Sequence, residues 1–570
     1  MAADGLYDDG FREALYRSAL TENIHPPEGV FAHPWISPGP LYRTIGGQWI
    51  WDACFSGLAV AKVGGRPDVA KGFVENLAAV VEPAGPDAGM ILHAADSAGK
   101  NPALIEGTSQ TPLVALLALE AHRLEPDAAF VERVYPALAG NVRWWRSPRR
   151  DVDQDGLSEF AGPGWRAALH ESGIDVGPNK ELLYFDPPAA GADGLVHDQV
   201  ADVVLNAALV SECESLAELA EVIGHADDAV EWRAEAEAIS RAMRARMWDD
   251  DIGAFLPCLR ADVVATQPRL HRVTPLVLAP LWAGVATADQ AARTIALVRG
   301  VPRQFPTAEG VMRIRLGSDA ELYRGHQVVT DGLCPPGFQG VPAGVQPGDV
   351  EMVGDGWRAA TGPVFRCEWP DDRNVATVWF ARLAVEIVLA PGSGAVVGEI
   401  VDGRGRVFPF DGGGAVFGEV SGPPGDRVPR GLRSVEVRAA GAGSPPACVR
   451  EVRVSYVRPE RAGLLSPYGI RSAHPLDGKY PAPGAPTHFW SGTVWAPFVW
   501  FACHAFRRYG EESLAVLLAE RYCHAVRRAH GLGAESPEHL SAETGVGMGA
   551  PNVAWTGAVA LLLESDFLRS

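Results

Sequence analysis

The chain has 570 residues, of which 47% are hydrophobic, and it carries a formal net charge of −20. This length exceeds that of one ordinary domain, so we expect one large domain with an additional module. The negative charge argues against nucleic acid and anionic membrane surfaces as partners, because both repel an acidic protein.

The cysteines and the N-terminus bear on cofactors and on the compartment. Eight cysteines are scattered without a Cys-x-x-Cys pair, so we expect no zinc ribbon or dithiol redox site, and we predict neither a metal nor a cofactor. The acidic start lacks the regions of a secretory signal peptide, and no apolar run has membrane-spanning length without interruption. We therefore predict a cytoplasmic protein with reduced thiols, and leave open whether it forms a homo-oligomer.

Helical periodicity dominates the first half of the chain. Apolar residues at helical spacing, between capping residues and Gly/Pro loops, predict helices over residues 8–22, 67–83, 110–124, 127–147, 197–223, 226–247, 273–284 and 287–299. In the helix over 226–247, the spacing predicts that Val230, Ala234 and Ile239 lie on the buried side.

A further helix is predicted directly after Trp49 and Trp51. Asp52 lies near its N-terminus, where an aspartate caps exposed N–H groups. The alternative is that Asp52 accepts hydrogen bonds from sugar hydroxyls beside the two indole rings. Gln110, at the start of a later helix, is also open to two interpretations. It is either an ordinary polar residue of the first turn or a hydrogen-bonding partner of a hydroxyl group.

Residues Asp151 to Gly156 read Asp-x-Asp-x-Asp-Gly, which is similar to the first half of an EF-hand calcium loop. However, the twelfth position is Gly162, where an EF-hand has Glu, and no second hand follows. We therefore favour a turn in which the aspartates accept hydrogen bonds from their own backbone.

Two stretches far apart in the chain carry acids among Gly and Pro residues. Residues 170–178 place Glu171 and Asp175 four positions apart, and their Gly and Pro content predicts a loop rather than a helix. Residues 535–545 contain Glu538. Taken singly, each acid is typical of a surface loop or a helix cap. Together, on a helical chain rich in tryptophan, they suggest a carboxylate pair that acts on a sugar.

The amino-acid composition changes over residues 306–460, where Gly and Pro are frequent and short runs of β-branched residues alternate with turns. Strands are predicted over 375–380, 385–389, 399–408, 434–438 and 449–456, with a hairpin around Asp402-Gly403. We interpret this stretch as an inserted β-rich module, a small sandwich. Covering a pocket mouth and self-association are both open as its role.

Helices resume over 489–508, 511–530 and 553–566. The total of about twelve helices in six consecutive hairpins predicts a mainly α fold, an (α/α)6 toroid with a β-rich inserted domain. Residues 1–305 and 461–570 would form the first and last parts of the barrel.

Four blocks resemble the (α/α)6-barrel glycoside hydrolases of family 63 and the related trehalases, with the closest likeness to the mannosylglycerate and glucosylglycerate hydrolase group. Gln48–Phe55 resembles the Trp-x-Trp-Asp block and Glu171–Asp175 the Glu-Ser-Gly-x-Asp loop. Phe489–Trp495 resembles Tyr-Trp-Arg-Gly-Pro-Val-Trp, and Glu538–Gly545 resembles Glu-x-x-Asn-Pro-x-Thr-Gly. The blocks also follow the family's order.

The resemblance implies an exo-acting, inverting α-glycosidase that hydrolyses a small α-glucoside or α-mannoside, with Asp175 as general acid and Glu538 as general base. In this reaction the acid protonates the glycosidic oxygen and the base activates a water, with the two carboxyl groups about 6.5–9.5 Å apart. The substrate-binding residues implied by the same blocks are Trp49, Trp51, Asp52, Gln110, Glu171, Trp490, Gly492 and Trp495. Glu171 is open to a second role, holding the loop.

The chain departs from the family pattern beside both acids. Ser541-Ala542 replaces Asn-Pro, Ser491 replaces Arg, and Val176-Gly177 replaces Asn-Ser. These changes leave the sugar and the aglycone undetermined. They also leave two alternatives open, a carbohydrate-binding pseudoenzyme and a non-hydrolytic enzyme that acts on a glycosylated metabolite in the same cavity.

Overall fold

The computed structural model divides the chain into two compact units, which we call the helical unit and the β unit. The helical unit comprises Met1–Arg299, Leu464–Ala473 and Phe489–Ser570, and the β unit comprises Gly300–Gly463 and His474–His488. The described residues are 6–174, 180, 183, 187–250, 252–260, 263, 273–300, 309–316, 326–330, 351–353, 356–359, 363–368, 382–389, 393–402, 407–412, 415–420, 432–439, 447–457, 463–473, 490, 492–531 and 535–569.

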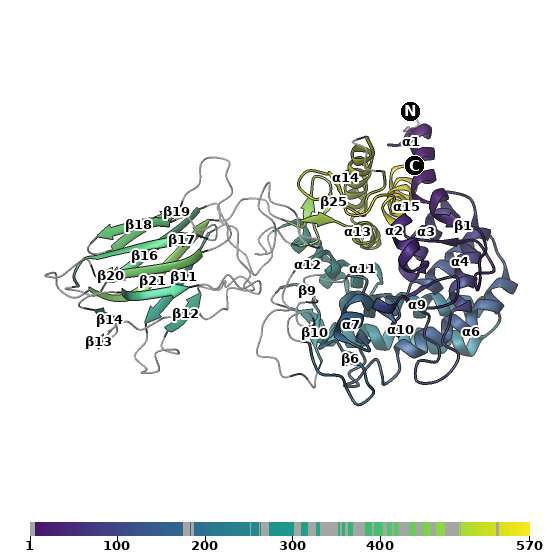
Figure 1. Ribbon diagram of the computed structural model, residues 1–570, viewed down its shortest axis with the longest axis horizontal. Coiled ribbons are helices and arrows are strands. Elements are labelled where there is room, and N and C mark those ends of the chain that lie inside the picture. Colours follow the sequence, from purple (N-terminus) through teal and green to yellow (C-terminus); the bar gives the residue numbers. More distant parts are fainter. Residues whose placement is uncertain are drawn as a thin grey trace. The chain divides into compact units, whose positions relative to one another are not determined.

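The helices of the helical unit follow the predicted order (Figure 1). They are α1 Asp9–Ala19, α2 Pro40–Ile45, α3 Ile50–Lys62, α4 Pro67–Ala79, α5 Val114–Leu124, α6 Ala128–Trp145, α7 Trp165–Glu171, α9 Val203–Val222, α10 Ala226–Arg246, α11 Ala279–Trp282, α12 Ala288–Arg299, α13 Ala496–Arg508, α14 Glu512–Gly531 and α15 Ala554–Leu563.

Six of the described helices contact one another in a closed cycle that runs α3, α5, α9, α11, α13, α15 and back to α3. The helices between them in sequence, α1, α4, α6, α10, α12 and α14, form the outer layer. Inner and outer helices thus alternate along the chain. This is the predicted (α/α)6 toroid.

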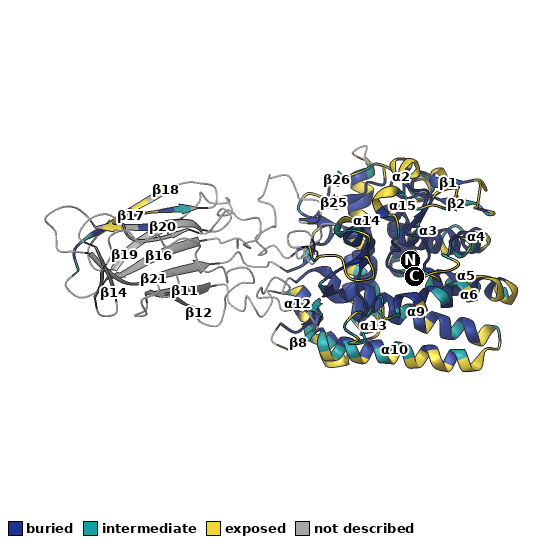
Figure 2. Ribbon diagram, turned by 60° about the horizontal axis from the view of Figure 1, so that its bottom comes forward, coloured by how far each residue is buried: buried dark blue, intermediate teal, exposed yellow. Residues whose placement is uncertain are grey.

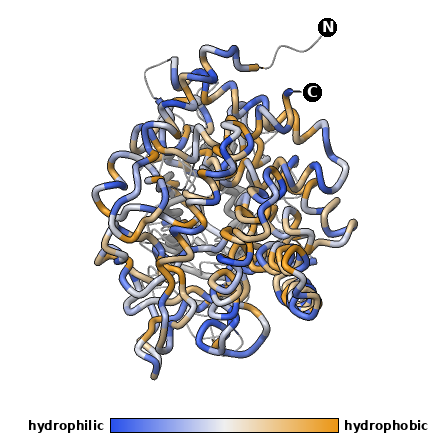
Figure 3. Tube along the Cα trace, turned by 90° about the vertical axis from the view of Figure 1, so that its right-hand side faces the viewer, coloured by the Kyte–Doolittle hydropathy of each residue, from blue (hydrophilic) through white to orange (hydrophobic). Residues whose placement is uncertain are grey.

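Residue chemistry explains the two layers. All ten residues of α15 are buried, as expected for an inner helix covered on every side. Outer helices such as α10 are amphipathic, and Figure 2 shows buried and exposed residues alternating along it. Figure 3 shows the same alternation in hydropathy along the helices. Among the described helices, none combines the length and the apolar character that crossing a bilayer requires.

The predicted buried face of α10 was wrong for two of its three residues. Val230 is 67% exposed, and Ala234 is exposed as well, while Ile239 is buried. The buried face instead passes through Trp232 and Met243. Burying the large indole ring of Trp232 removes more apolar area from water than burying Val230, which sets the rotation of the helix.

The connections between helices differ at the two ends of the toroid. Those that lead from an inner to the next outer helix are short, for example residues 63–66 and 125–127. Those that lead into an inner helix are long, for example 80–113, 146–202 and 532–553. The long connections therefore gather at the N-terminal ends of the inner helices.

Short antiparallel strand pairs order these long connections. They are β1 Ile24–His25 with β2 Trp35–Ile36, β3 Gln48–Trp49 with β4 Ala94–Ala95, β5 Ala161–Gly162 with β6 Val196–His197, β7 Val200–Ala201 with β10 Cys258–Leu259, β8 Trp248–Asp249 with β9 Ala254–Phe255, β22 Leu465–Ser466 with β23 Gly469–Ile470, and the three strands β24 Thr493–Val494, β25 His539–Ser541 and β26 Gly547–Met548.

The β unit is inserted in the connection between α12 and α13, and its described strands form two antiparallel sheets. One sheet has the order β12-β11-β21-β14-β13, with β16 joining β21 to β19, and the other has the order β15-β20-β17-β18. The strands are β11 Glu309–Leu316, β12 His326–Thr330, β13 Glu351–Val353, β14 Gly356–Ala359, β15 Pro363–Glu368, β16 Arg382–Leu389, β17 Val396–Asp402, β18 Val407–Gly412, β19 Ala415–Val420, β20 Leu432–Ala439 and β21 Ala447–Val457.

The predicted hairpin is present as β17 and β18, which pair antiparallel with Glu399 opposite Pro409. The strand predicted over 375–380 lies outside the described residues.

A buried carboxylate links two inner helices. The residue before α5, Leu113, provides no side-chain cap. Instead Glu212, in the middle of α9, accepts hydrogen bonds from the backbone N–H groups of Ala115 and Leu116, both at 3.0 Å. Burial raises the pKa of Glu212 to about 7. The side chain thus caps a neighbouring helix rather than its own.

Replacing Glu212 with alanine is expected to lower the free energy of unfolding by about 1–3 kcal/mol, because two buried N–H groups lose their acceptor. Glu214→Ala is the matched control, since Glu214 is an exposed acid on the same helix. Urea unfolding of both variants measures the difference. Equal stability of the two variants would contradict the capping role.

Candidate active site

One pocket, with a volume of about 180 Å³, opens at the N-terminal ends of the inner helices. Its lining is mostly aromatic and aliphatic, with a few polar groups. It consists of Pro38, Tyr42, Ile45, Trp49, Trp51, Asp52, His93, Leu104, Ile105, Gln110, His170, Gly173, Trp490, Trp495, Glu538, Val553 and Trp555.

The N-terminus of α3 forms one wall of the pocket. Trp49 pairs with Ala94 in a short strand, and the helix begins at the next residue. Gln110 accepts a hydrogen bond from the N–H of Trp51 at 3.0 Å through its side-chain oxygen. Gln110 therefore caps α3 from another connection and fixes the first turn that carries Asp52.

Asp52 is buried in the first turn of α3. Burial raises its pKa to about 8, and the negative charge of Glu538 adds to the shift. Asp52 is therefore protonated at neutral pH, when it can donate a hydrogen bond as well as accept one. It suits contact with a hydroxyl group better than pairing with a cation.

Glu538 also lines the pocket, from the connection that precedes α15, and is 5% exposed. The hydroxyl of Tyr42 donates to its Oε1 at 2.6 Å, and the N–H of Ala550 donates to its Oε2 at 3.0 Å. A Cβ at position 549 would lie 2.4 Å from Oε2, so only glycine leaves room for the carboxylate there. These contacts hold the carboxylate in one orientation.

Indole rings supply a second wall. Trp490 stacks on Trp495 with ring centroids 3.9 Å apart and an angle of 13° between the rings, and His539 also stacks on Trp495, at 4.5 Å. Trp555 meets Trp51 and Trp495 edge to face. Flat aromatic surfaces of this kind bind the apolar faces of sugar rings.

The segment before Asp175 is held by a buried ion pair. Glu171 accepts a hydrogen bond from Arg150 at 2.7 Å, and both side chains are fully buried. The N–H groups of Ser109 and Ala161 also donate to Glu171, at 3.0 and 2.7 Å. Burial raises the pKa of Glu171, and Arg150 opposes that shift. With these partners, Glu171 holds the segment and does not line the pocket.

The prediction of a loop from residue 170 was wrong for its first two residues, because His170 and Glu171 form the last turn of α7. The chain leaves the helix through Gly173, whose φ is +68° and whose absent side chain admits the ring of Trp51. Beyond the acid, Lys180 is buried and pairs with Asp198 at 3.1 Å and Asp202 at 3.2 Å. Asp175 itself lies outside the described residues.

The structure brings most of the predicted site residues together. Trp49, Trp51, Asp52, Gln110, Trp490, Trp495 and Glu538 all line the pocket. Gly492 is not among the lining residues; its φ is +76° and its carbonyl accepts a hydrogen bond from Ala542 N–H at 3.0 Å. Of the departures from the family pattern, Ala542 makes this contact and Ser541 precedes it, whereas Ser491 and Val176-Gly177 lie outside the described residues.

Sequence reasoning missed Tyr42, His93, His170 and Trp555 as lining residues. Burial lowers the pKa of His93 to about 3, so this ring is neutral and serves as a hydrogen-bonding wall rather than as an acid. Tyr42 lies in a Pro-rich stretch that gives no pattern, and Trp555 has the spacing of a core residue in α15. No signal in the chain distinguished these residues from ordinary core positions.

The sequence model of one family, the mannosylglycerate hydrolase MGH1-like glycoside hydrolase domain, matches residues 46–311 and 445–556. No curated protein matches the chain by sequence. Among solved structures, the family 63 mannosylglycerate hydrolase from Thermus thermophilus in complex with Tris is similar at a TM-score of 0.51 and 15% identity, over 96% of this chain and 97% of that chain. Neutral trehalase Nth1 from Saccharomyces cerevisiae is similar at a TM-score of 0.52 and 14% identity, over 94% of this chain and 74% of that chain.

Asp52 makes the stability of the protein depend on pH. Its pKa of about 8 lies above the ordinary value of 3.8. Between these values the unfolded chain has lost a proton that the folded protein keeps, so the free energy of unfolding falls as pH rises through this window. Asp52→Asn removes that loss. We therefore expect the difference between the thermal unfolding midpoints of the variant and of the unchanged protein to grow in the variant's favour from pH 5 to pH 8. A difference that stays constant over this range would argue against a protonated Asp52.

Proposed function

Because the chain belongs to the mannosylglycerate hydrolase MGH1-like glycoside hydrolase family, we propose that it is an exo-acting, inverting α-glycosidase that hydrolyses a small α-glucoside or α-mannoside. The observation that carries this proposal is the placement of Glu538. Its carboxylate lines an aromatic pocket together with Asp52, held by two donors.

Glu538 is proposed as the general base. Each carboxylate oxygen accepts one hydrogen bond, from Tyr42 or from Ala550, and each keeps a second lone pair. A free lone pair facing the pocket can take a proton from a water molecule, and the resulting nucleophile attacks the anomeric carbon. The two donors fix the direction of that lone pair, which supports a positioned water.

Asp175 is proposed as the general acid. It follows the pocket-lining Gly173 by two residues, a span of at most about 7 Å. Glu171 before it in the chain and Lys180 after it both make buried ion pairs. The acid would give its proton to the glycosidic oxygen as the bond to the anomeric carbon breaks, while water attacks from the opposite face and inverts the configuration.

The pocket also supports the exo-acting mode and the substrate class. It lies at the end of a closed helix ring, where a terminal sugar fits better than the middle of a chain. The stacked pair Trp490 and Trp495 offers a flat surface for one sugar face. Asp52, protonated at neutral pH, and Gln110 offer both donors and acceptors to hydroxyl groups.

Asp175→Asn and Glu538→Gln are each expected to lower hydrolysis of a cleavable α-glycoside by a factor of about 1,000 or more, because each removes the proton donor or the base. Hydrolysis of α-linked disaccharides and glycosylglycerates, followed by NMR, measures the rates and the anomer first released. Glu212→Gln, a buried acid outside the pocket, is the matched control and should remain active. Full activity of either site variant, or a product with retained configuration, would refute the mechanism.

Tyr42→Phe tests the positioning of the base. The variant loses the 2.6 Å hydrogen bond to Glu538, so we expect kcat to fall roughly tenfold, with a smaller change in KM. Tyr509→Phe is the control, since the Tyr509 hydroxyl donates to the carbonyl of Ala286 outside the pocket. If Tyr42→Phe changes KM alone, Tyr42 contacts the substrate and does not orient Glu538.

A further inference from the structure

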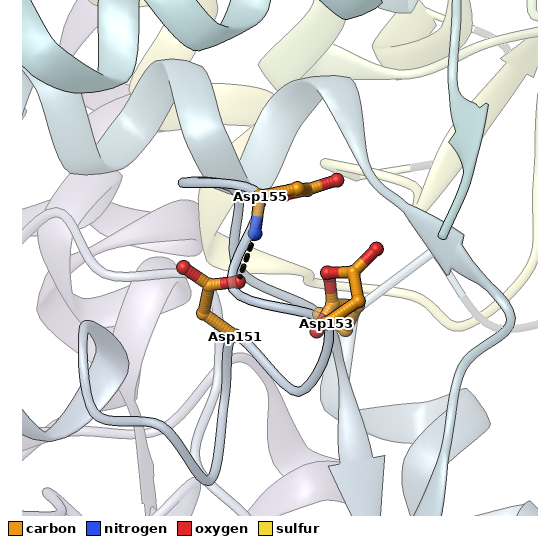
Figure 4. Close-up of side chains that lie close together, drawn as sticks. Asp151, Asp153 and Asp155 are labelled. Atoms are coloured by element: carbon orange, nitrogen blue, oxygen red, sulfur yellow. Dashed lines mark hydrogen bonds between the residues drawn. The ribbon is translucent and has the colours of Figure 1, made fainter. Parts of the chain in front are cut away.

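The connection between α6 and α7 brings four carboxylates together. In sequence they are distant from the acids that line the pocket. One oxygen from each of Asp151, Asp153, Asp155 and Glu159 lies within 4.8 Å of the others. Figure 4 shows the three aspartates projecting from a single loop. None of these side chains lines the pocket.

The loop has the predicted self-bonded turn. Asp151 accepts hydrogen bonds from the N–H groups of Asp155 at 2.9 Å and Gly156 at 3.1 Å, the first of which is drawn in Figure 4. Asp155 in turn accepts from Leu157 N–H at 2.8 Å. These bonds fix the carboxylates in place but occupy only part of their lone pairs, since each oxygen has two.

Glu159 is the independent observation that points to a ligand. Its side chain is 0% exposed, and Oε2 accepts a hydrogen bond from Val152 N–H at 3.2 Å. Its Oε1 has no hydrogen-bond partner among the described residues, although Glu159 is a member of the cluster. A buried carboxylate oxygen without a donor is costly.

Arginines account for part of the negative charge. Arg246 pairs with Asp155. Arg146 and Arg260 act on Asp151 and Glu159 through their charge, but the hydrogen bonds of Arg146 go to Glu235, Gly156 and Ser158, and Arg260 donates to the carbonyl of Asp198. None of these contacts reaches Oε1 of Glu159.

We propose that this loop is a calcium site, with Asp151, Asp153, Asp155 and Glu159 as carboxylate ligands. The donors are hard oxygens without His or Cys, which disfavours zinc and copper. Calcium accepts six to eight oxygen ligands in flexible geometry, including backbone carbonyls and waters, whereas magnesium demands an octahedron with shorter bonds. Glu159, at the ninth position, takes the place of the twelfth-position glutamate that the chain lacks.

The site braces the segment that leads to the pocket. The N–H of Glu159 donates to the carbonyl of Arg150 at 2.7 Å, and the Arg150 side chain holds Glu171. A cation bound to Glu159 therefore stiffens the backbone that positions the Arg150–Glu171 pair. The calcium site is structural, and it stands independently of the proposed reaction.

The test uses the full chain stripped with EDTA and then supplied with calcium or magnesium. We expect one calcium per chain by elemental analysis after dialysis, and a rise in the midpoint of thermal unfolding of about 3 °C at a hundredfold excess over Kd. Magnesium at the same concentration should give less than half that shift. No bound calcium and no shift, or equal effects of the two ions, would overturn the proposal.

Glu159→Gln and Asp153→Asn locate the effect. Both should lose at least nine-tenths of the calcium-induced shift, whereas Asp289→Asn, an exposed acid on α12, should keep it. In EDTA, Glu159→Gln should unfold at the same temperature as the unchanged protein or higher, because it replaces a buried acid beside three aspartates with a neutral amide. A calcium shift that persists in both loop variants places the cation elsewhere and ends the assignment.

Discussion

The arrangement of the site depends on one buried ion pair, that of Arg150 with Glu171. It joins two connections, because Glu171, at the end of α7, accepts from Ser109 before α5 and from Ala161 after the acidic loop. Replacing a buried ion pair by apolar residues is often neutral or even stabilising, so its value here lies in geometry. The guanidinium also lies over the ring of Trp144 at 4.0 Å, which leaves it a single position. The segment that enters the pocket thus starts from a rigid point.

The connectivity of the toroid explains why the pocket-lining residues lie at one end of the helix ring. Consecutive helices are antiparallel, so connections of three to five residues close one end and leave the other to long loops. The N-terminal ends of the inner helices face those loops, and their free N–H groups attract acceptors. Gln110 and Glu212 meet this demand from neighbouring connections and helices rather than from the capping position. The acceptors that satisfy the helix ends thereby lock adjacent parts of the ring to one another.

Much of this architecture was predictable from the chain, for identifiable reasons. Helical periodicity and Gly/Pro loops gave the helix order, and the family resemblance singled out Trp51, Asp52 and Glu538, which line one pocket. Periodicity failed for Val230 because it does not weigh an indole ring against a small aliphatic side chain. Tyr42 was missed because its role comes from a contact across 496 positions, which no local pattern records. Glu171 was left between two roles, and only its partners distinguish them.

The closing contact of the helix ring carries a consequence for synthesis. α3 packs against α15, and the hydroxyl of Tyr7 donates to the carbonyl of Cys523, so the first and last helices complete one another. Residues 300–463, which form most of the β unit, emerge from the ribosome in between, a delay on the order of ten seconds or more at usual elongation rates. During that interval the face of α3 that later packs against α15 has no partner within its own chain. The nascent protein therefore passes through a stage at which chaperone capture competes with ring closure.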